Sequence, residues 1–192
     1  MSPILGIIAS QNYVRTPPSV LAYDSIATSV VGAGGVSTVT FSSIPSTYKH
    51  LQIRCINRDT TSTYQSNDLY MNFNGDTASN YSFHRLYGTG ASVAADSGAT
   101  QTYMLVGQQA TNLSGASMFG ANVIDIFEYT NTSIYKTSRS LGGVDLNGNT
   151  DGRMMLQSGN WRNTAAITSI TFRATTGNLA QYSHFALYGI KG

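Results

Sequence analysis

The stretch KHLQIRCINR, residues 49–58, decides the fold class of this chain. In it, the apolar residues Leu51, Ile53 and Cys55 alternate with polar ones. Successive side chains of a β-strand point to opposite faces, so a period of two buries one face and leaves the other in water. We therefore predict a half-buried strand whose apolar face lies on a core.

Runs of the same kind recur on both sides of this strand. They are separated by segments rich in Gly, Asn and Ser, which favour turns, and no segment has a convincing helical period. The predicted strands lie at residues 22–31, 36–41, 49–58, 68–73, 80–88, 102–107, 121–129, 133–146, 153–161, 165–174 and 182–190. Many short strands with frequent turns predict an all-β fold, namely an antiparallel β-sandwich of jelly-roll type.

Turn-forming residues predict which strands are neighbours. The GAGG turn at 32–35 predicts a hairpin of the first two strands, and Asn74-Gly75 supplies left-handed backbone for a tight reversal into the next strand. The segment TTGNLAQ, residues 175–181, predicts a final hairpin of the last two strands. Residues 88–100, nearly all of them small, are expected to form a loop.

An extended arm is expected to precede the strands. Pro17 and Pro18 favour a polyproline-like backbone, and neither a repeat nor a charge-rich linker divides the rest of the chain. We predict an N-terminal arm, residues 1–20, followed by a single β-sandwich domain, residues 21–192.

The composition indicates a surface made for contact with other chains. Only 10% of the residues are charged, against roughly 25% in an ordinary soluble domain. Ser, Thr, Asn and Gly make up about two-fifths of the chain, well above typical usage. Such side chains lose little rotamer entropy and carry little charge to desolvate. The net charge of +2 comes from scattered basic residues, so we expect no nucleic-acid partner.

The sequence also argues against a membrane protein and against export. No stretch approaches the roughly 20 apolar residues of a membrane span. The opening MSPILGIIAS lacks the basic region and the longer apolar core of a signal peptide. We expect synthesis in the cytoplasm without export by the usual route.

Candidate catalytic residues do not combine into a site. Cys55, the only cysteine, lies on an apolar strand face and is expected to be a core residue. Asp125 and Glu128 are three apart in a strand and therefore face opposite sides, which makes them poor partners for acid–base work. The three histidines fall in separate predicted strands without metal-ligand spacing: His50, His84 and His184. We predict no enzymatic activity, no cofactor and no metal ligands.

The segment DLNGNTDG, residues 145–152, is the best metal candidate. Oxygen-bearing side chains alternate along it as in a calcium loop: Asp145, Asn147, Asn149 and Asp151. However, Thr150 and Leu156 stand where such a loop needs Gly and a bidentate Glu. Because Asn and Asp also favour plain turns, we predict a turn here and keep calcium binding as the alternative.

The chain has twelve tyrosines and one tryptophan. Exposed aromatic rings among Ser, Gly and Asn can stack on sugars or anchor an interface, whereas sandwich domains also place Tyr rings in the core with the hydroxyl at the rim. We favour the core interpretation for any single Tyr. If the rings do bind glycans, the polar loops at 59–67 and 88–100 are the expected places.

Four stretches together resemble structural proteins of tailed-bacteriophage virions, especially those of phages of aquatic bacteria. They span most of the chain: MSPILGIIASQNY at the start, STVTFSSIPSTYKHLQIR, MNFNGDTASNYSFHRLYG, and AAITSITF with YSHFALYGIKG at the end. They are distinctive as a set, but they identify a structural family and not a chemical site.

The resemblance implies a β-sandwich module displayed on the particle. The first hypothesis is a capsid decoration (cement) protein, a homotrimer that binds the major capsid protein or another virion protein. We expect a virion-anchoring arm, whose apolar residues would bind the partner: Ile4, Leu5, Ile7, Ile8 and Tyr13. The second hypothesis is a tail or head fibre domain that binds host surface glycans. The absence of a coiled-coil or repetitive shaft favours the first.

Overall fold

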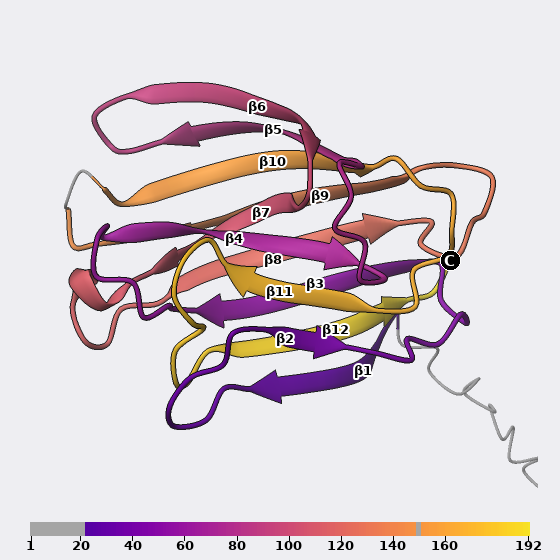
Figure 1. Ribbon diagram of the computed structural model, residues 1–192, viewed down its shortest axis with the longest axis horizontal. Coiled ribbons are helices and arrows are strands. Elements are labelled where there is room, and N and C mark those ends of the chain that lie inside the picture. The colour runs from indigo at the N-terminus through magenta and orange to yellow at the C-terminus, as the bar shows by residue number, and fades with distance from the viewer. Residues whose placement is uncertain (1–21, 149–150) are drawn as a thin grey trace, which may run out of the picture.

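The computed structural model describes residues 22–148 and 151–192. Two antiparallel sheets pack face to face, which confirms the predicted all-β sandwich (Figure 1). The strands are β1 (Tyr23–Val30), β2 (Val39–Phe41), β3 (His50–Asn57), β4 (Ser66–Phe73), β5 (Tyr81–Gly88), β6 (Val93–Gln101), β7 (Met104–Ala110), β8 (Gly120–Phe127), β9 (Lys136–Val144), β10 (Arg153–Trp161), β11 (Ile170–Ala174) and β12 (His184–Ile190). A short 3-10 turn, η1 (Asn112–Ser114), follows β7.

Eight of these strands have the order of a jelly roll. The first part of the large sheet runs β1-β12-β3-β8, and the small sheet runs β2-β11-β4-β7. The chain therefore alternates between the sheets in the pattern of two nested Greek keys. This arrangement confirms the jelly-roll type that the strand spacing predicts.

Two hairpins extend the large sheet beyond the jelly roll. The hairpin β9–β10 follows β8, and the hairpin β5–β6 follows β4. Strand β9 pairs with β8, and β10 pairs with β5, so the large sheet has eight strands in the order β1-β12-β3-β8-β9-β10-β5-β6. We call β9, β10, β5 and β6 the appended half. Figure 1 shows β5 and β6 reaching past the edge of the small sheet.

All three predicted sequential pairings are wrong. Strand β1 pairs with β12 and not with β2, β4 and β5 lie in different sheets, and so do β11 and β12. The left-handed backbone predicted at Asn74 and Gly75 is present, with φ angles of 52° and 67°. In a jelly roll, however, these turns carry the chain from one sheet to the other, because each connection spans the sandwich.

The predicted loop at 88–100 is also wrong in its larger part. Residues Val93–Gln101 form β6, an edge strand that pairs with β5. Its side chains are mostly small and exposed, so it has no apolar alternation from which a strand could be read. The backbone hydrogen bonds to β5 hold it in the sheet instead.

The core lies between the two sheets, mainly under the jelly-roll part of the large sheet, and Tyr81 of β5 and Trp161 of β10 extend it into the appended half. The faces predicted for β3 and β4 are confirmed, because Leu51, Ile53, Cys55, Leu69 and Met71 are all buried. All five side chains belong to one continuous apolar cluster. The predicted anchoring arm, with Ile4, Leu5, Ile7, Ile8 and Tyr13, lies outside the described residues.

Candidate interaction surface

The outer face of the large sheet carries aliphatic side chains in a single cross-strand row. Val123 of β8 lies opposite Leu141 of β9, Leu141 lies opposite Leu156 of β10, and Leu156 lies opposite Leu86 of β5. These four residues, which we call the ridge, are 39%, 56%, 48% and 50% exposed, respectively. Side chains directly opposite one another on a sheet touch, so the ridge is a continuous apolar strip across four strands.

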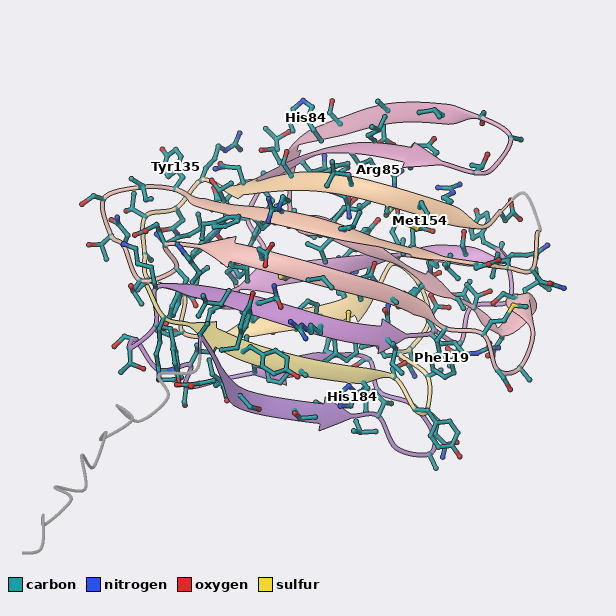
Figure 2. All side chains as sticks on the ribbon, turned by 180° about the vertical axis from the view of Figure 1, so that it is seen from behind. His84, Arg85, Phe119, Tyr135, Met154 and His184 are labelled. Atoms are coloured by element: carbon teal, nitrogen blue, oxygen red, sulfur yellow. The ribbon has the colours of Figure 1, made fainter. Side chains whose placement is uncertain are left out.

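A row of mostly small residues runs beside the ridge. Two positions further along the same strands, Ala121 lies opposite Gly143, Gly143 opposite Met154, and Met154 opposite Gly88. We call these four residues the groove, because they line a hollow in the outer face. Figure 2 views the molecule from this side and labels Met154 in the upper part of the sheet.

Gly143 has no room for a side chain. A Cβ atom there would lie 2.2 Å from the carbonyl oxygen of Arg153 on the neighbouring strand. A contact this short forces the backbone to move, so the floor of the groove at this point needs glycine. The groove is therefore fixed by the sheet itself and is not an accident of side-chain rotamers.

In the middle of the appended half, polar side chains point inward and leucines point outward. Strand β9 buries Ser140 and exposes Leu141. Strand β10 buries Gln157 and exposes Leu156, although Trp161 of the same strand is a buried apolar residue. An antiparallel sheet with one wet face normally has polar residues outside and apolar residues inside. Apolar side chains are therefore left on the outer face of this half.

Ion pairs and amides occupy part of the space inside the appended half. Arg85 bridges two carboxylates, Asp68 Oδ1 at 3.0 Å and Asp96 Oδ1 at 2.6 Å, and the Gln108 side chain also donates to Asp68. Burial raises the pKa of Asp68 above its ordinary value, although the positive charge of Arg85 opposes this. A buried polar group that loses its hydrogen-bond partner is costly. Arg85 of β5 and Gln108 of β7 share the acceptor Asp68, so this network fixes the position of β5 over β7.

The rim of the ridge is charged. On the row beyond it, Arg139 of β9 pairs with Asp125 of β8 at 2.9 Å and keeps 61% of its side-chain surface exposed. Just after β9, on the far side of the groove, Asp145 is exposed. One of its carboxylate oxygens accepts a hydrogen bond from the backbone N–H of Asn147 at 2.8 Å.

The predicted turn at 145–152 is confirmed where the structure describes it. Besides the bond from Asn147 to Asp145, the left-handed φ angles of Asn147 and Gly148, 55° and 77°, are those of a tight turn. Asn149, one of the four oxygen-bearing residues of the alternative calcium site, lies outside the described residues, so calcium binding is not tested.

The structure does not bring the three histidines together. His50 accepts a hydrogen bond from the backbone N–H of Glu128, His84 lies on β5, and His184 lies on β12 (Figure 2). Within residues 22–148 and 151–192, no three His, Cys, Asp or Glu side chains are grouped closely enough to hold a metal ion.

Cys55 is the core residue that the alternation predicts. It is buried, and burial raises the pKa of its thiol to about 12. The thiol therefore stays protonated at neutral pH and is a poor nucleophile.

The tyrosines are divided between core and surface. Tyr81 and Tyr129 are fully buried, in agreement with the favoured interpretation, whereas Tyr64, Tyr135 and Tyr182 are 53–66% exposed. In the loop at 59–67, only the outer part faces solvent, because Asp59 is buried and accepts hydrogen bonds from Asn67 and Gln109.

Sequence reasoning missed the ridge. The alternation in SRSLGGV, residues 138–144, predicts a strand but does not tell which side faces a core, because Ser and Leu both fit either side. Only the pairing register of β9, β10 and β5 shows that Leu141, Leu156 and Leu86 align.

No helix in the described part of the chain is both long enough and apolar enough to cross a lipid bilayer. A comparison with protein-family models and with curated proteins finds no match to this chain.

Proposed function

We propose that this chain is a structural subunit of a bacteriophage virion, a capsid decoration (cement) protein that binds the major capsid lattice and stabilises the head. The observation that carries its role in assembly is the ridge, a strip of four exposed aliphatic residues on the outer face of the large sheet. Contiguous exposed apolar surface of this kind is typical of protein–protein contact sites.

The composition and the fold are compatible with this role. A jelly roll is a rigid scaffold that recurs in viral capsid and lectin domains. The surface is poor in charge, so it loses little hydration when it is packed against neighbours. The resemblance of four stretches of the sequence to phage structural proteins supplies the virion setting.

A fibre domain that binds host glycans is the second candidate. The exposed loop residues Tyr64 and Tyr182 favour it, because exposed tyrosine rings stack well on sugar faces. The ridge is not needed for glycan binding, so we rank this function second.

The number of copies per particle separates the two functions. We expect quantitative mass spectrometry of purified virions to find the chain at a copy number comparable to that of the major capsid protein. A few tens of copies or fewer would support the fibre and contradict the decoration protein. Absence from the particle would reject both.

Deletion of residues 1–18 tests the arm. We expect the truncated protein to keep the thermal unfolding transition of the full chain but to be lost from the particle. The substitution Thr40→Asp, on the exposed outer face of the small sheet, is the control and should be incorporated normally. Normal incorporation of the truncated chain would show that the arm is not the anchor.

A further inference from the structure

We propose that the outer face of the large sheet binds a second copy of this chain across a two-fold axis that runs parallel to the ridge, midway between ridge and groove. This inference rests on the same ridge as the proposed function, but it does not need the virion setting. It rests on three features of the outer face: the spacing of two rows, the charges at their margins and the exposed apolar area.

The first feature is steric complementarity. Rotation about such an axis places the ridge of each copy over the groove of the other, because the two rows are one strand period, or about 7 Å, apart. On each strand the ridge residue then faces the groove residue of the same strand. Val123 faces Ala121 of the second copy, Leu141 faces Gly143, and Leu86 faces Gly88.

The one large side chain in the groove is adaptable. Met154 faces Leu156 of the second copy in this arrangement, and methionine has three rotatable bonds with which to fit an irregular gap. Both copies bury the same surface, as a two-fold interface requires. Face-to-face packing of two sheets is also how the sandwich itself is built.

The second feature is charge. The same rotation brings position 139 of one copy opposite position 145 of the other. Each position is three residues from Gly142, and the axis crosses β9 at Gly142. Arg139 of each copy therefore faces Asp145 of the other. Arg139 has an exposed guanidinium and Asp145 is exposed, so two intermolecular ion pairs can form at the margins. An offset of one strand period toward Asp145 would bring its carboxylate opposite Leu141, whereas the proposed register brings it opposite Arg139.

The third feature is area. The ridge, Met154 and the flanking residues Ile56 and Val93 expose apolar surface on the order of 500–700 Å². A standard interface buries about 800 Å² on each partner. The small and polar residues around the ridge supply the remainder, so the face is large enough for a stable dimer.

The mass of the full chain in solution tests the proposal. We expect light scattering after gel filtration at tens of micromolar to give twice the 20.5 kDa of the chain. Leu141→Asp should weaken association at least about 100-fold, because it buries an unpaired charge in the centre of the interface. Its thermal unfolding should stay close to that of the wild-type monomer, since the side chain is exposed in the single chain.

Charge reversal gives the specific control for the two-fold arrangement. Asp145→Arg should weaken the dimer about tenfold because it opposes Arg139 of the second copy. Both charge reversals are made with Asp125→Asn, so that an Asp at 139 has no carboxylate beside it, and adding Arg139→Asp should then restore most of the loss. Thr40→Asp, on the far face, should leave the association unchanged.

A monomer at these concentrations would overturn the proposal. So would a dimer that Leu141→Asp leaves intact. The homotrimer that the resemblance implies would also overturn it, because a two-fold interface closes with two copies. Failure to rescue by the double charge reversal would reject this two-fold register. None of these outcomes changes the copy number per particle, so this proposal and the virion proposal can fail separately.

Discussion

The two halves of the large sheet bury different kinds of side chain. In the jelly-roll half, Ile53, Ile124 and Phe185 are fully buried between the sheets. In the appended half, the inner face carries polar Gln157 as well as apolar Trp161, and the leucines point outward. One sheet therefore has an apolar interior at one end and a mixed interior at the other.

The outer faces differ in the opposite sense. Over the jelly-roll half, Arg54 lies across the rings of Tyr23 and Tyr188 and donates to Gln52, so polar and aromatic groups already cover the strands. Over the appended half, Arg139 lies across the ring of Phe127, but the three leucines of the ridge stay exposed. The added hairpins therefore leave an apolar surface open, and this is the surface that we propose for contact.

The largest expected effect is on the jelly-roll core. Ile124→Asp places an unpaired charge in the apolar cluster, and we expect a loss on the order of 5 kcal/mol or more, enough to abolish soluble protein. Phe185→Asp should behave in the same way. The neighbouring Val123→Asp points to the outer face and should stay folded. The yield of soluble protein and its melting curve distinguish the two positions, and a normal melt for Ile124→Asp would contradict the core assignment.

A buried lysine at the start of β9 gives the next largest effect. The Nζ atom of Lys136 donates to the carbonyl oxygens of Asn131, Ile134 and Thr164, at 2.5, 2.9 and 2.9 Å. Lys136→Ala leaves these three acceptors without their donor, and we expect a loss of about 3–5 kcal/mol in chemical denaturation.

Two control variants separate the causes of that loss. Lys136→Met keeps most of the volume but no donor, so it should lose nearly as much. Lys49→Ala removes a surface ion pair with Glu128 and should change the stability by less than about 1 kcal/mol. Full stability of Lys136→Met would show that packing, and not hydrogen bonding, holds the loops at this end of the appended half.

The crossing from β4 of the small sheet to β5 of the appended half is expected to lose stability in acid. Burial opposes ionisation of Asp76, but hydrogen bonds from Asn80, Trp161 and the Ala78 N–H outweigh it, so the pKa of Asp76 lies below its usual value. A carboxylate with a lowered folded-state pKa stabilises fully above its unfolded-state pKa, near 3.9, and loses this effect as the pH falls through the folded-state pKa.

Asp76→Asn should therefore cost about 1–2 kcal/mol at pH 7, and the difference from the wild type should shrink below roughly pH 4. Denaturation curves at several pH values measure it. A difference that stays constant down to pH 2 would show that the charge of Asp76 is not what stabilises the crossing.

The smallest effect is expected inside the appended half. The Oε1 atom of Gln157 has no hydrogen-bond partner in the described structure, and its Nε2 donates only to Ser140 Oγ, at 3.2 Å. Gln157→Leu should change stability by less than about 1 kcal/mol, because it removes as much desolvation cost as hydrogen bonding. A loss above about 2 kcal/mol in chemical denaturation would show that the polar interior is as demanding as the apolar core.

Much of the fold could be predicted from the sequence, and little of the surface. The alternation at Leu51, Ile53 and Cys55 gave both a strand and its buried face, since an apolar row next to a charged one has only one favourable orientation. The ridge could not be found in this way, because it exists only when three distant leucines come into register. The predicted anchoring arm lies outside the described residues and remains a prediction.

The sequence by itself determined where most of the strands are and that they form a sandwich, because side-chain period and turn chemistry act over a few residues. Strand β6 was missed, because its small exposed side chains have no apolar alternation. Only the tertiary structure decided which strands pair, and hence that Leu86, Leu141 and Leu156 share one row. Backbone hydrogen bonds between strands are the same for every sequence, so pairing depends on how all the faces are buried together. That is why the expected hairpins were wrong, whereas the core faces of β3 and β4 were right.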